Sequence, residues 1–389
     1  MVPGTRPGPF FVKPVANLIQ YEGRSPYPKP NRRHLGGSVL GSRFAESKNS
    51  LNAIRLLLAA TVILSHSWWL GGYGPEPSPG DVKLGSWAVL GFFGVSGYLI
   101  ARSRVRATSS FSYFIARLLR IFPGLVVCVA VVAFVLAPLT AVIAGNSYFM
   151  PDAVIFFVTN LSAGAPGVAV PGIAGTLDGV HDPGSWNGPL WTLFWELVCY
   201  GIVGLVLGLL RPKLARVALL VPFLAGSAFV FTLDAGWGPV STPPDWPLIP
   251  VLTFLAGSLV YLFQNTIPAS ESMLILTGGL VFLVAGLGFT ASLVHLPLSI
   301  FLILGSLHMP FSSVGSRFDM SYGVYIYGWP VQQVLASMGL HAAVPPLVFA
   351  GASLLLVAPI AWLSCRYVEQ PAQRRHRSRA LQRRVEELA

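Results

Sequence analysis

Long apolar runs, separated by short polar and basic segments, dominate the chain from Leu51 onward. A bilayer core needs about 20 apolar residues in a helix, and in lipid a helix pairs all of its own backbone groups. The pattern therefore predicts an all-α fold, namely a polytopic membrane helix bundle with about ten transmembrane helices. The expected spans lie near residues 51–71, 86–103, 121–143, 189–210, 215–233, 247–264, 272–290, 291–309, 321–340 and 344–365.

Basic residues lie mainly between these runs, which gives the spans an orientation. They collect in the first fifty residues, in Arg102 to Arg120, in Arg211 to Arg216 and in Arg366 to Arg384. Lys and Arg are enriched in cytoplasmic loops, and an even number of spans leaves both ends on one side. Both termini are therefore predicted to be cytoplasmic, and the loops 71–85 and 144–188 to face outward.

Three parts follow from this layout. Residues 1–50, rich in Pro, Gly and Arg, predict a largely irregular cytoplasmic segment without a cleaved signal peptide. Residues 51–371 form the membrane domain, with an outer loop at 144–188, and residues 372–389 form a basic cytoplasmic tail. Residues 151–163 are apolar but too short to span, so we expect a re-entrant or interfacial piece there.

Composition excludes a soluble protein. Of 389 residues, 53% are hydrophobic and only 11% are charged, whereas about a quarter of a soluble protein is charged. The net charge of +11 is compatible with nucleic-acid binding, but its distribution between apolar runs favours membrane lipid and no nucleic acid as a partner. Three cysteines lie singly in apolar segments, without the spacing of a metal site or a disulfide framework. They are Cys128, Cys199 and Cys365.

The first span carries two ionisable residues, Arg55 and His66, eleven positions apart. At about 100° per residue they return to nearly the same helix face, about 16 Å apart along the axis. Ionisable groups inside a membrane are costly and are functional candidates, and a histidine can take and return a proton near neutral pH. The alternative is structural: the guanidinium group of Arg55 would reach the membrane surface, and His66 would form a hydrogen bond with a neighbouring helix.

A second candidate is the pair Arg117 and Arg120, which share a helical face on the predicted inner side. Two adjacent guanidinium groups suit the phosphates of a coenzyme A or nucleotide donor. A topology signal that binds anionic lipid head groups is the alternative.

A third candidate is Glu196, in an otherwise uncharged stretch at the outer start of the fourth span. Its carboxylate would orient or charge-balance His66, or bind sugar hydroxyls, with pairing to an arginine elsewhere as the alternative. Trp191 and Trp195 offer flat faces to a sugar ring. Tyr325 lies in an aromatic run with a Trp-Pro break, typical of a helix that lines a cavity or of a kinked core helix.

Taken in order from about Leu51 to Pro371, these elements resemble the acyltransferase-3 family of membrane O-acyltransferases. Arg55 and His66 are similar to the family's Arg-x10-His motif, and FIARLLRIFPG at 114–124 to its Arg-x-x-Arg signature. The blocks GFFGVSGYLIARS at 91–103, WNGPLWTLFWE at 186–196 and SYGVYIY at 321–327 extend the resemblance. Gly328 stands where many members of the family carry a histidine before Trp-Pro.

The resemblance implies an enzyme of the bacterial inner (cytoplasmic) membrane, with acyl-coenzyme A, expected to be acetyl-CoA, as the cytoplasmic donor and no metal. The implied acceptor is a carbohydrate or glycolipid hydroxyl at the outer side. His66 would be the base or proton shuttle, Arg55 its partner on the same helix, and Arg117 and Arg120 the donor-binding pair. The expected remaining site residues are Glu196, Trp191, Trp195 and Tyr325.

Several alternatives stay open. A multi-pass transporter or flippase for a glycan or lipid-linked substrate would use the same charged residues. No internal repeat relates the two halves of the sequence, which disfavours that class. A scaffold without activity, a homo-oligomer, and either direct transfer or a transient acyl-histidine are further alternatives.

Overall fold

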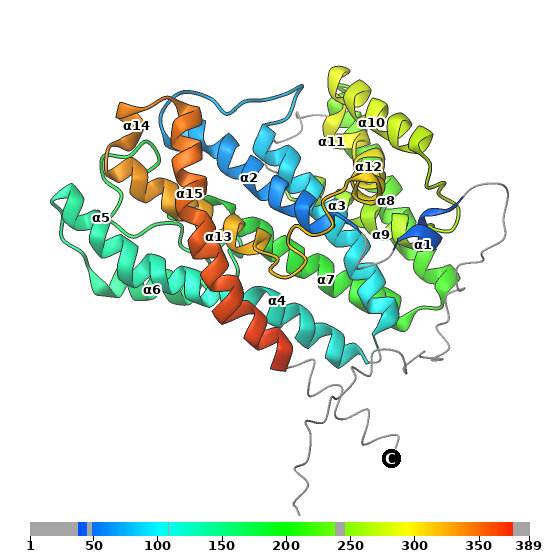
Figure 1. Ribbon diagram of the computed structural model, residues 1–389, viewed down its shortest axis with the longest axis horizontal. Coiled ribbons are helices and arrows are strands. Elements are labelled where there is room, and N and C mark those ends of the chain that lie inside the picture. The colour runs from blue at the N-terminus through cyan, green and yellow to red at the C-terminus, as the bar shows by residue number, and fades with distance from the viewer. Residues whose placement is uncertain (1–37, 45–48, 108, 238–245, 376–389) are drawn as a thin grey trace, which may run out of the picture.

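The computed structural model describes residues 38–44, 49–107, 109–237 and 246–375, which fold into helices joined by turns and loops (Figure 1). The only β contact within these residues is an isolated antiparallel bridge between Val39 and Pro268. The all-α prediction is therefore confirmed for the described residues. Most of the predicted segment 1–50 and most of the tail 372–389 lie outside them.

The chain runs through the following elements. They are α1 (Leu40–Arg43), α2 (Leu51–Leu70), α3 (Leu84–Arg106), α4 (Ser110–Val131), the π-helical turn η1 (Val132–Leu136), α5 (Ala137–Ala144), α6 (Met150–Asn160), the 3₁₀ turn η2 (Gly188–Leu190), α7 (Trp191–Leu209), α8 (Pro212–Asp234), α9 (Leu248–Leu262), α10 (Glu271–Gly286), α11 (Thr290–Leu293), α12 (His295–His308), α13 (Ser321–Ser337), α14 (Leu340–Ala343), α15 (Pro346–Ser364) and the π-helical turn η3 (Cys365–Glu369).

Six helical segments of the described chain are long and apolar enough to cross a membrane. They are Leu51–Leu70, Leu84–Arg106, Ser110–Ala144, Gly188–Leu209, Pro212–Asp234 and Pro346–Arg375. Helices α9, α10 and α12 are apolar but shorter. The protein is therefore an integral membrane protein, whereas the count of ten spans and the side on which the termini lie stay predictions.

The third predicted span begins earlier than the apolar pattern indicates. Helix α4 starts at Ser110, where the Ser109 hydroxyl accepts the Ser112 backbone N–H, and the helix continues through η1 and α5 to Ala144. Arg117 and Arg120 therefore lie within a helix. Helix α6 falls on the predicted short apolar piece, has 11 residues, and packs beside α4 and η1 (Figure 1). It is too short to span, and its re-entrant or interfacial position stays a prediction.

Close packing between α3 and α9 fixes the centre of the bundle. A β-carbon at Gly97 would collide with the carbonyl of Phe254, and one at Gly257 with the carbonyl of Gly94. Small residues let membrane helices approach until their backbones touch. Helix α3 also packs against α2 and α7, and the deeply buried α13 lies between α2 and α15. This packing holds together α2, α7 and α13, which carry most of the predicted site residues.

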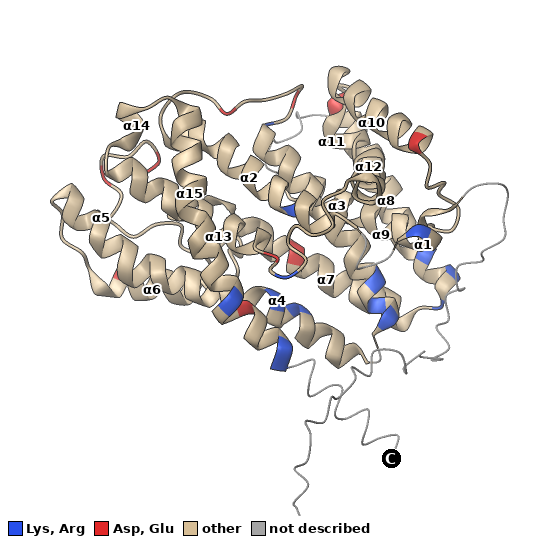
Figure 2. Ribbon diagram, viewed as in Figure 1, with Lys and Arg blue, Asp and Glu red and all other residues tan. Residues whose placement is uncertain are grey.

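Charge is distributed unevenly over the bundle. Lys and Arg gather on α1, at the end of α3, on α4 and at the end of α15, toward the right and the bottom of the molecule in Figure 2. We call this the basic end and the other the opposite end. Helix α2 runs from the basic end, at Leu51, to the opposite end, at Leu70.

Candidate active site

Two polar clusters lie at the two ends of α2. Arg55 belongs to the first, which also contains Arg120, Asp319 and Glu369 and is named the Asp319 cluster. His66 belongs to the second, with Glu76, and is named the His66 cluster. The predicted pair therefore shares one helix, but its two members serve different clusters.

Asp319 is the centre of its cluster. Its Oδ2 lies 2.5 Å from Nη1 of Arg55 and 2.6 Å from Nη2 of Arg120. Its Oδ1 accepts hydrogen bonds from the Ser321 hydroxyl at 2.6 Å and the Ser321 backbone N–H at 3.2 Å. Burial acts to raise the pKa of the Asp319 carboxyl, but the two arginines and Ser321 outweigh it and hold this pKa well below its usual range.

Glu369 completes this cluster from the C-terminal end of α15. The side chain is 1% exposed, its Oε2 lies 4.0 Å from Nη1 of Arg120, and its Oε1 accepts a hydrogen bond from Ser364 at 3.1 Å. It is the last residue of η3, the wide turn that follows α15. A buried carboxylate needs such partners, because removing a charge from water costs several kcal/mol.

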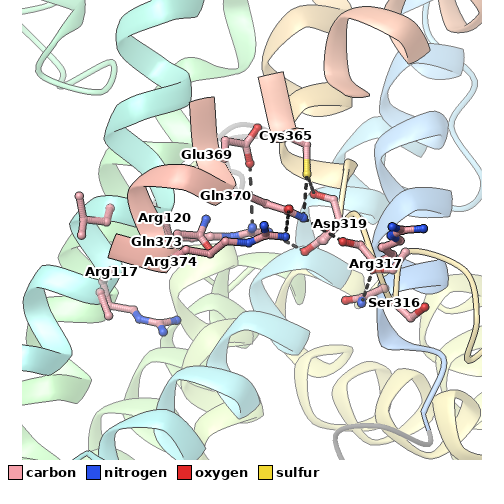
Figure 3. Close-up of a pocket in the computed structure, with 14 residues that line it drawn as sticks. Arg117, Arg120, Ser316, Arg317, Asp319, Cys365, Glu369, Gln370, Gln373 and Arg374 are labelled. Carbon is pink, nitrogen blue, oxygen red and sulfur yellow. Dashed lines mark hydrogen bonds and ion pairs between the residues drawn. The ribbon is translucent and has the colours of Figure 1, made fainter. Parts of the chain in front are cut away.

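A pocket of about 450 Å³ opens beside the Asp319 cluster. Its charged lining comes from α4, from the loop before α13 and from the end of α15 (Figure 3). These charged residues are Arg117, Arg120, Arg317, Arg374, Asp319 and Glu369. Four arginines against two carboxylates leave a lining of net charge +2. Guanidinium forks bind phosphate oxygens in pairs, so this pocket suits a phosphorylated anion.

The loop before α13 is tied to α2 at Gly315. The Gly315 carbonyl accepts a hydrogen bond from Nδ2 of Asn52 at 2.9 Å, and Gly315 has a φ of +67°. Glycine adopts this left-handed conformation without cost, and a β-carbon there would press on Asn52. The tie places Asp319 over the first turns of α2.

Glu196 lies on α7 and pairs with neither Asp319 nor His66. Its Oε1 accepts hydrogen bonds from Ser96 at 2.8 Å and from Tyr200 at 2.7 Å. One alternative drawn from the sequence made Glu196 the partner of His66. In the structure the carboxylate beside His66 is that of Glu76, which the loop after α2 brings to the ring. A role of Glu196 in the site stays a prediction.

The aromatic candidates occupy the start of α7 and the facing side of α13. The Tyr325 hydroxyl lies 2.6 Å from the Thr192 hydroxyl, and the Tyr325 ring packs on Phe92. Trp191 and Trp195 are half-buried on the first two turns of α7. Sugar binding by these side chains stays a prediction.

The His66 cluster joins α2, the loop after it, and α13. Nδ1 of His66 lies 3.2 Å from Oε2 of Glu76, at an angle outside that of a hydrogen bond. The Ser65 hydroxyl donates to the same oxygen at 2.6 Å, and the Trp329 ring meets the imidazole edge-on at 4.9 Å between centroids. Burial acts to raise the pKa of Glu76, but His66, Ser65 and the Lys83 ammonium outweigh it and lower this pKa to about 2.

The loop before α7 covers this cluster. The Trp329 indole N–H donates to the Ser185 carbonyl at 3.0 Å, and Gln333 donates to the same carbonyl at 2.8 Å. A β-carbon at Gly188 would collide with the Trp329 ring. This loop is therefore fixed on α13, directly beside His66.

The sequence did not single out Glu76 or Asp319. Each lies in a loop between two helices, where hydrophobic periodicity does not indicate the direction of a side chain. In the described part of the chain, no group of three or more His, Cys, Asp or Glu side chains could hold a metal ion.

Comparison with known proteins gives the class of the enzyme. The chain is 29% identical over 324 residues to the "O-acetyl transferase" of Shigella phage Sf6, covering 81% of this chain and 93% of that protein. It is 25% identical over 362 residues to "Nodulation protein 10" of Rhizobium leguminosarum bv. viciae, covering 84% of this chain and 94% of that protein. No solved structure matches. Residues 48–366 match the acyltransferase domain of the acyltransferase-3 family, so the chain belongs to this family and is an acyltransferase.

Proposed function

We propose that this protein is a membrane O-acetyltransferase that moves an acetyl group from acetyl-CoA to a hydroxyl of a glycan or glycolipid. The observation that carries the proposal is the presence, at the two ends of α2, of an arginine-lined pocket and a histidine paired with a carboxylate. The name of the phage relative, an O-acetyl transferase, supports the acetyl group and the hydroxyl acceptor.

The donor binds at the basic end in this proposal. Arg117 and Arg120 hold its phosphates, and Arg317 and Arg374 extend the positive lining of the same pocket. Charge-assisted hydrogen bonds from arginine to phosphate are stronger than neutral ones. Arg55, which the sequence assigned to catalysis, adjoins this pocket through Asp319 and therefore acts on the donor side.

The reacting thioester lies near His66. The eleven residues from Arg55 to His66 span about 16 Å of helix, so the donor needs a flexible arm between its phosphates and its thioester, and the pantetheine arm of coenzyme A is such an arm. Hydroxyl groups of Ser96, Tyr200 and Tyr325 lie on the helices that flank this route.

His66 then acts as the general base. It takes the proton of the acceptor hydroxyl while that oxygen forms a bond to the thioester carbonyl carbon, and the carbon–sulfur bond breaks. The departing thiolate takes up a proton as coenzyme A. The acetyl group passes to the acceptor directly or through a transient acetyl-histidine.

The basic end faces the cytoplasm in this proposal, because cytoplasmic ends carry an excess of Lys and Arg. The donor pocket then opens to the compartment that contains coenzyme A, and the His66 cluster lies on the outer side. The bacterial inner membrane is the corresponding location.

Release of coenzyme A by the purified protein in detergent, with acetyl-CoA and a bacterial surface glycan, tests this function. We expect His66→Ala to lower release by about 100-fold or more, and His341→Ala, in the short helix α14, to leave it unchanged. Full activity of folded His66→Ala would refute the role of this histidine. Glycan flux into liposomes without any coenzyme A release would favour the transporter instead.

A further inference from the structure

We propose that Glu76 is a positioning residue that orients the imidazole of His66 for proton transfer. The proposal rests on the function proposed above for His66. It adds a residue from the loop between α2 and α3 to a site otherwise assigned to helices.

The carboxylate of Glu76 is built into the bundle rather than lying free on the loop. Its side chain is 8% exposed, with Oε2 held by the Ser65 hydroxyl and Oε1 3.7 Å from the Lys83 ammonium. The Ser65 hydroxyl in turn accepts the backbone N–H of Gly85 at 2.8 Å, which ties the start of α3 to the end of α2. A buried carboxylate held in this way keeps its position when the ring beside it changes charge.

The loop that carries Glu76 is itself fixed at both sides of that residue. The Tyr73 hydroxyl donates to the Val344 carbonyl at 2.8 Å, and the Leu84 N–H donates to the Pro77 carbonyl at 2.7 Å. The Trp87 indole N–H donates to the Pro79 carbonyl at 3.0 Å. These bonds hold the loop against α3 and the start of α15.

A carboxylate on one side of a histidine selects the tautomer of the ring. Because Oε2 faces Nδ1 of His66 at 3.2 Å, the carboxylate favours the tautomer of the neutral ring with its proton at Nδ1 and its lone pair at Nε2. Trp329 limits rotation of the ring from a second side. Nε2 is then the atom that takes the acceptor proton. The contact between Nδ1 of His66 and the Glu76 carboxylate becomes a better aligned hydrogen bond when the ring gains its positive charge. Catalytic hydrogen bonds commonly tighten in this way in the reactive complex.

The proton balance is simple. The hydroxyl proton of the acceptor moves to Nε2, the proton at Nδ1 stays between His66 and Glu76, and the new positive charge faces the Glu76 carboxylate. The Lys83 ammonium, on the other oxygen, weakens this attraction without cancelling it. Return of the Nε2 proton to the coenzyme A thiolate restores the neutral ring.

Kinetics of three variants test the proposal. Glu76→Gln keeps the shape of the side chain and removes its charge, and we expect kcat to fall about 10- to 100-fold, less than on loss of the base itself. The KM for acetyl-CoA should not change, because the donor pocket lies at the other end of α2. Glu76→Asp should recover part of kcat. Glu271→Gln, exposed in the first turn of α10, is the matched control.

A double variant separates positioning from a structural role. In a His66→Ala background, Glu76→Gln should cause no further loss of the residual activity, because a positioning residue acts only through the ring. If His66→Ala is inactive while Glu76→Gln keeps its full kcat, the positioning role is overturned and the proposed function stands. If folded His66→Ala is fully active, the base role that the proposed function gives to His66 fails, and the positioning role of Glu76 fails with it.

A second variant covers the case in which Glu76→Gln does not fold. Ser65→Ala removes one hydrogen bond to Glu76 and keeps every charge, so we expect a loss of kcat of about threefold, and no loss in the His66→Ala background. An equal loss in both backgrounds would assign Ser65 and Glu76 to stability alone and overturn the proposal.

Discussion

Replacing Asp319 by Asn is the most direct test of the polar cluster at the basic end. The substitution preserves shape and removes the charge that pairs with Arg55 at 2.5 Å and with Arg120 at 2.6 Å. Breaking a buried pair by removing one partner costs about 3–5 kcal/mol. Asp319 is 19% exposed beside a pocket, and an amide still bonds to Ser321, so we expect a loss of about 2–4 kcal/mol.

The assay is unfolding of the purified protein in detergent, followed by tryptophan fluorescence with and without acetyl-CoA. A bound anion would supply the negative charge that Asp319→Asn lacks, so the donor should stabilise the variant more than the wild type. Asp178→Asn, exposed in the outer loop, is the matched control. If Asp319→Asn unfolds as the wild type does, or gains nothing extra from the donor, the ion-pair reasoning is wrong.

Three further predictions concern the donor, acid stability and packing. Arg117→Gln and Arg120→Gln should each raise the KM for acetyl-CoA about 10-fold or more, because a hydrogen bond to a charged group is worth about 1.5–3 kcal/mol; an unchanged KM would remove them from the donor site. Glu76 has a pKa lowered to about 2, so its contribution to stability should be complete above about pH 4.5 and disappear as the pH falls toward 2; Glu76→Gln should flatten this part of a pH–stability curve, and an unaltered curve would contradict the pairing. Gly97→Val should abolish folded protein in a size-exclusion assay, because its β-carbon meets the α9 backbone, whereas Gly279→Val, with open space around it, should fold; normal yield of Gly97→Val would refute the close packing.

Arg211 provides the control for the donor prediction. It is exposed at the start of α8 and makes no part of the pocket lining. Arg211→Gln should therefore leave the KM for acetyl-CoA unchanged. A rise equal to that of Arg117→Gln would indicate a general effect of surface charge.

Helical periodicity was sufficient to place Arg55 and His66 on one helix and at its two ends. It could not supply their partners, because Asp319 and Glu76 reach α2 from loops whose paths depend on tertiary packing. The sequence does mark the place of each carboxylate. Asp319 precedes the first residue of α13 by two positions. Glu76 lies among Pro and Gly residues between two apolar runs.

The start of α4 was placed too late for a related physical reason. Arg117 and Arg120 lower the mean hydropathy of the sequence around them, so the apolar pattern indicates a start after them. In the structure both side chains line a pocket, and their helix begins at Ser110. Glu196 was correctly placed on α7, one turn from Tyr200, but the rotation of α7 about its axis turns the carboxylate toward Ser96 of α3. Such rotations depend on side-chain packing across several helices, which a single sequence does not display.

The wide turn η3 has a consequence for inserted and deleted residues. A π-helical turn holds one more residue than an α-helical turn, so deletion of a single residue between Cys365 and Glu369 would let the helix close to regular α geometry. An α-helical turn with one residue fewer covers nearly the same rotation about the axis as the π-helical turn, so the side chains beyond it would keep their directions. Gln370, Gln373 and Arg374, which line the pocket, would therefore stay in it, whereas deletion of one residue from the regular α-helical part of α15 would turn all three away together by about 100°.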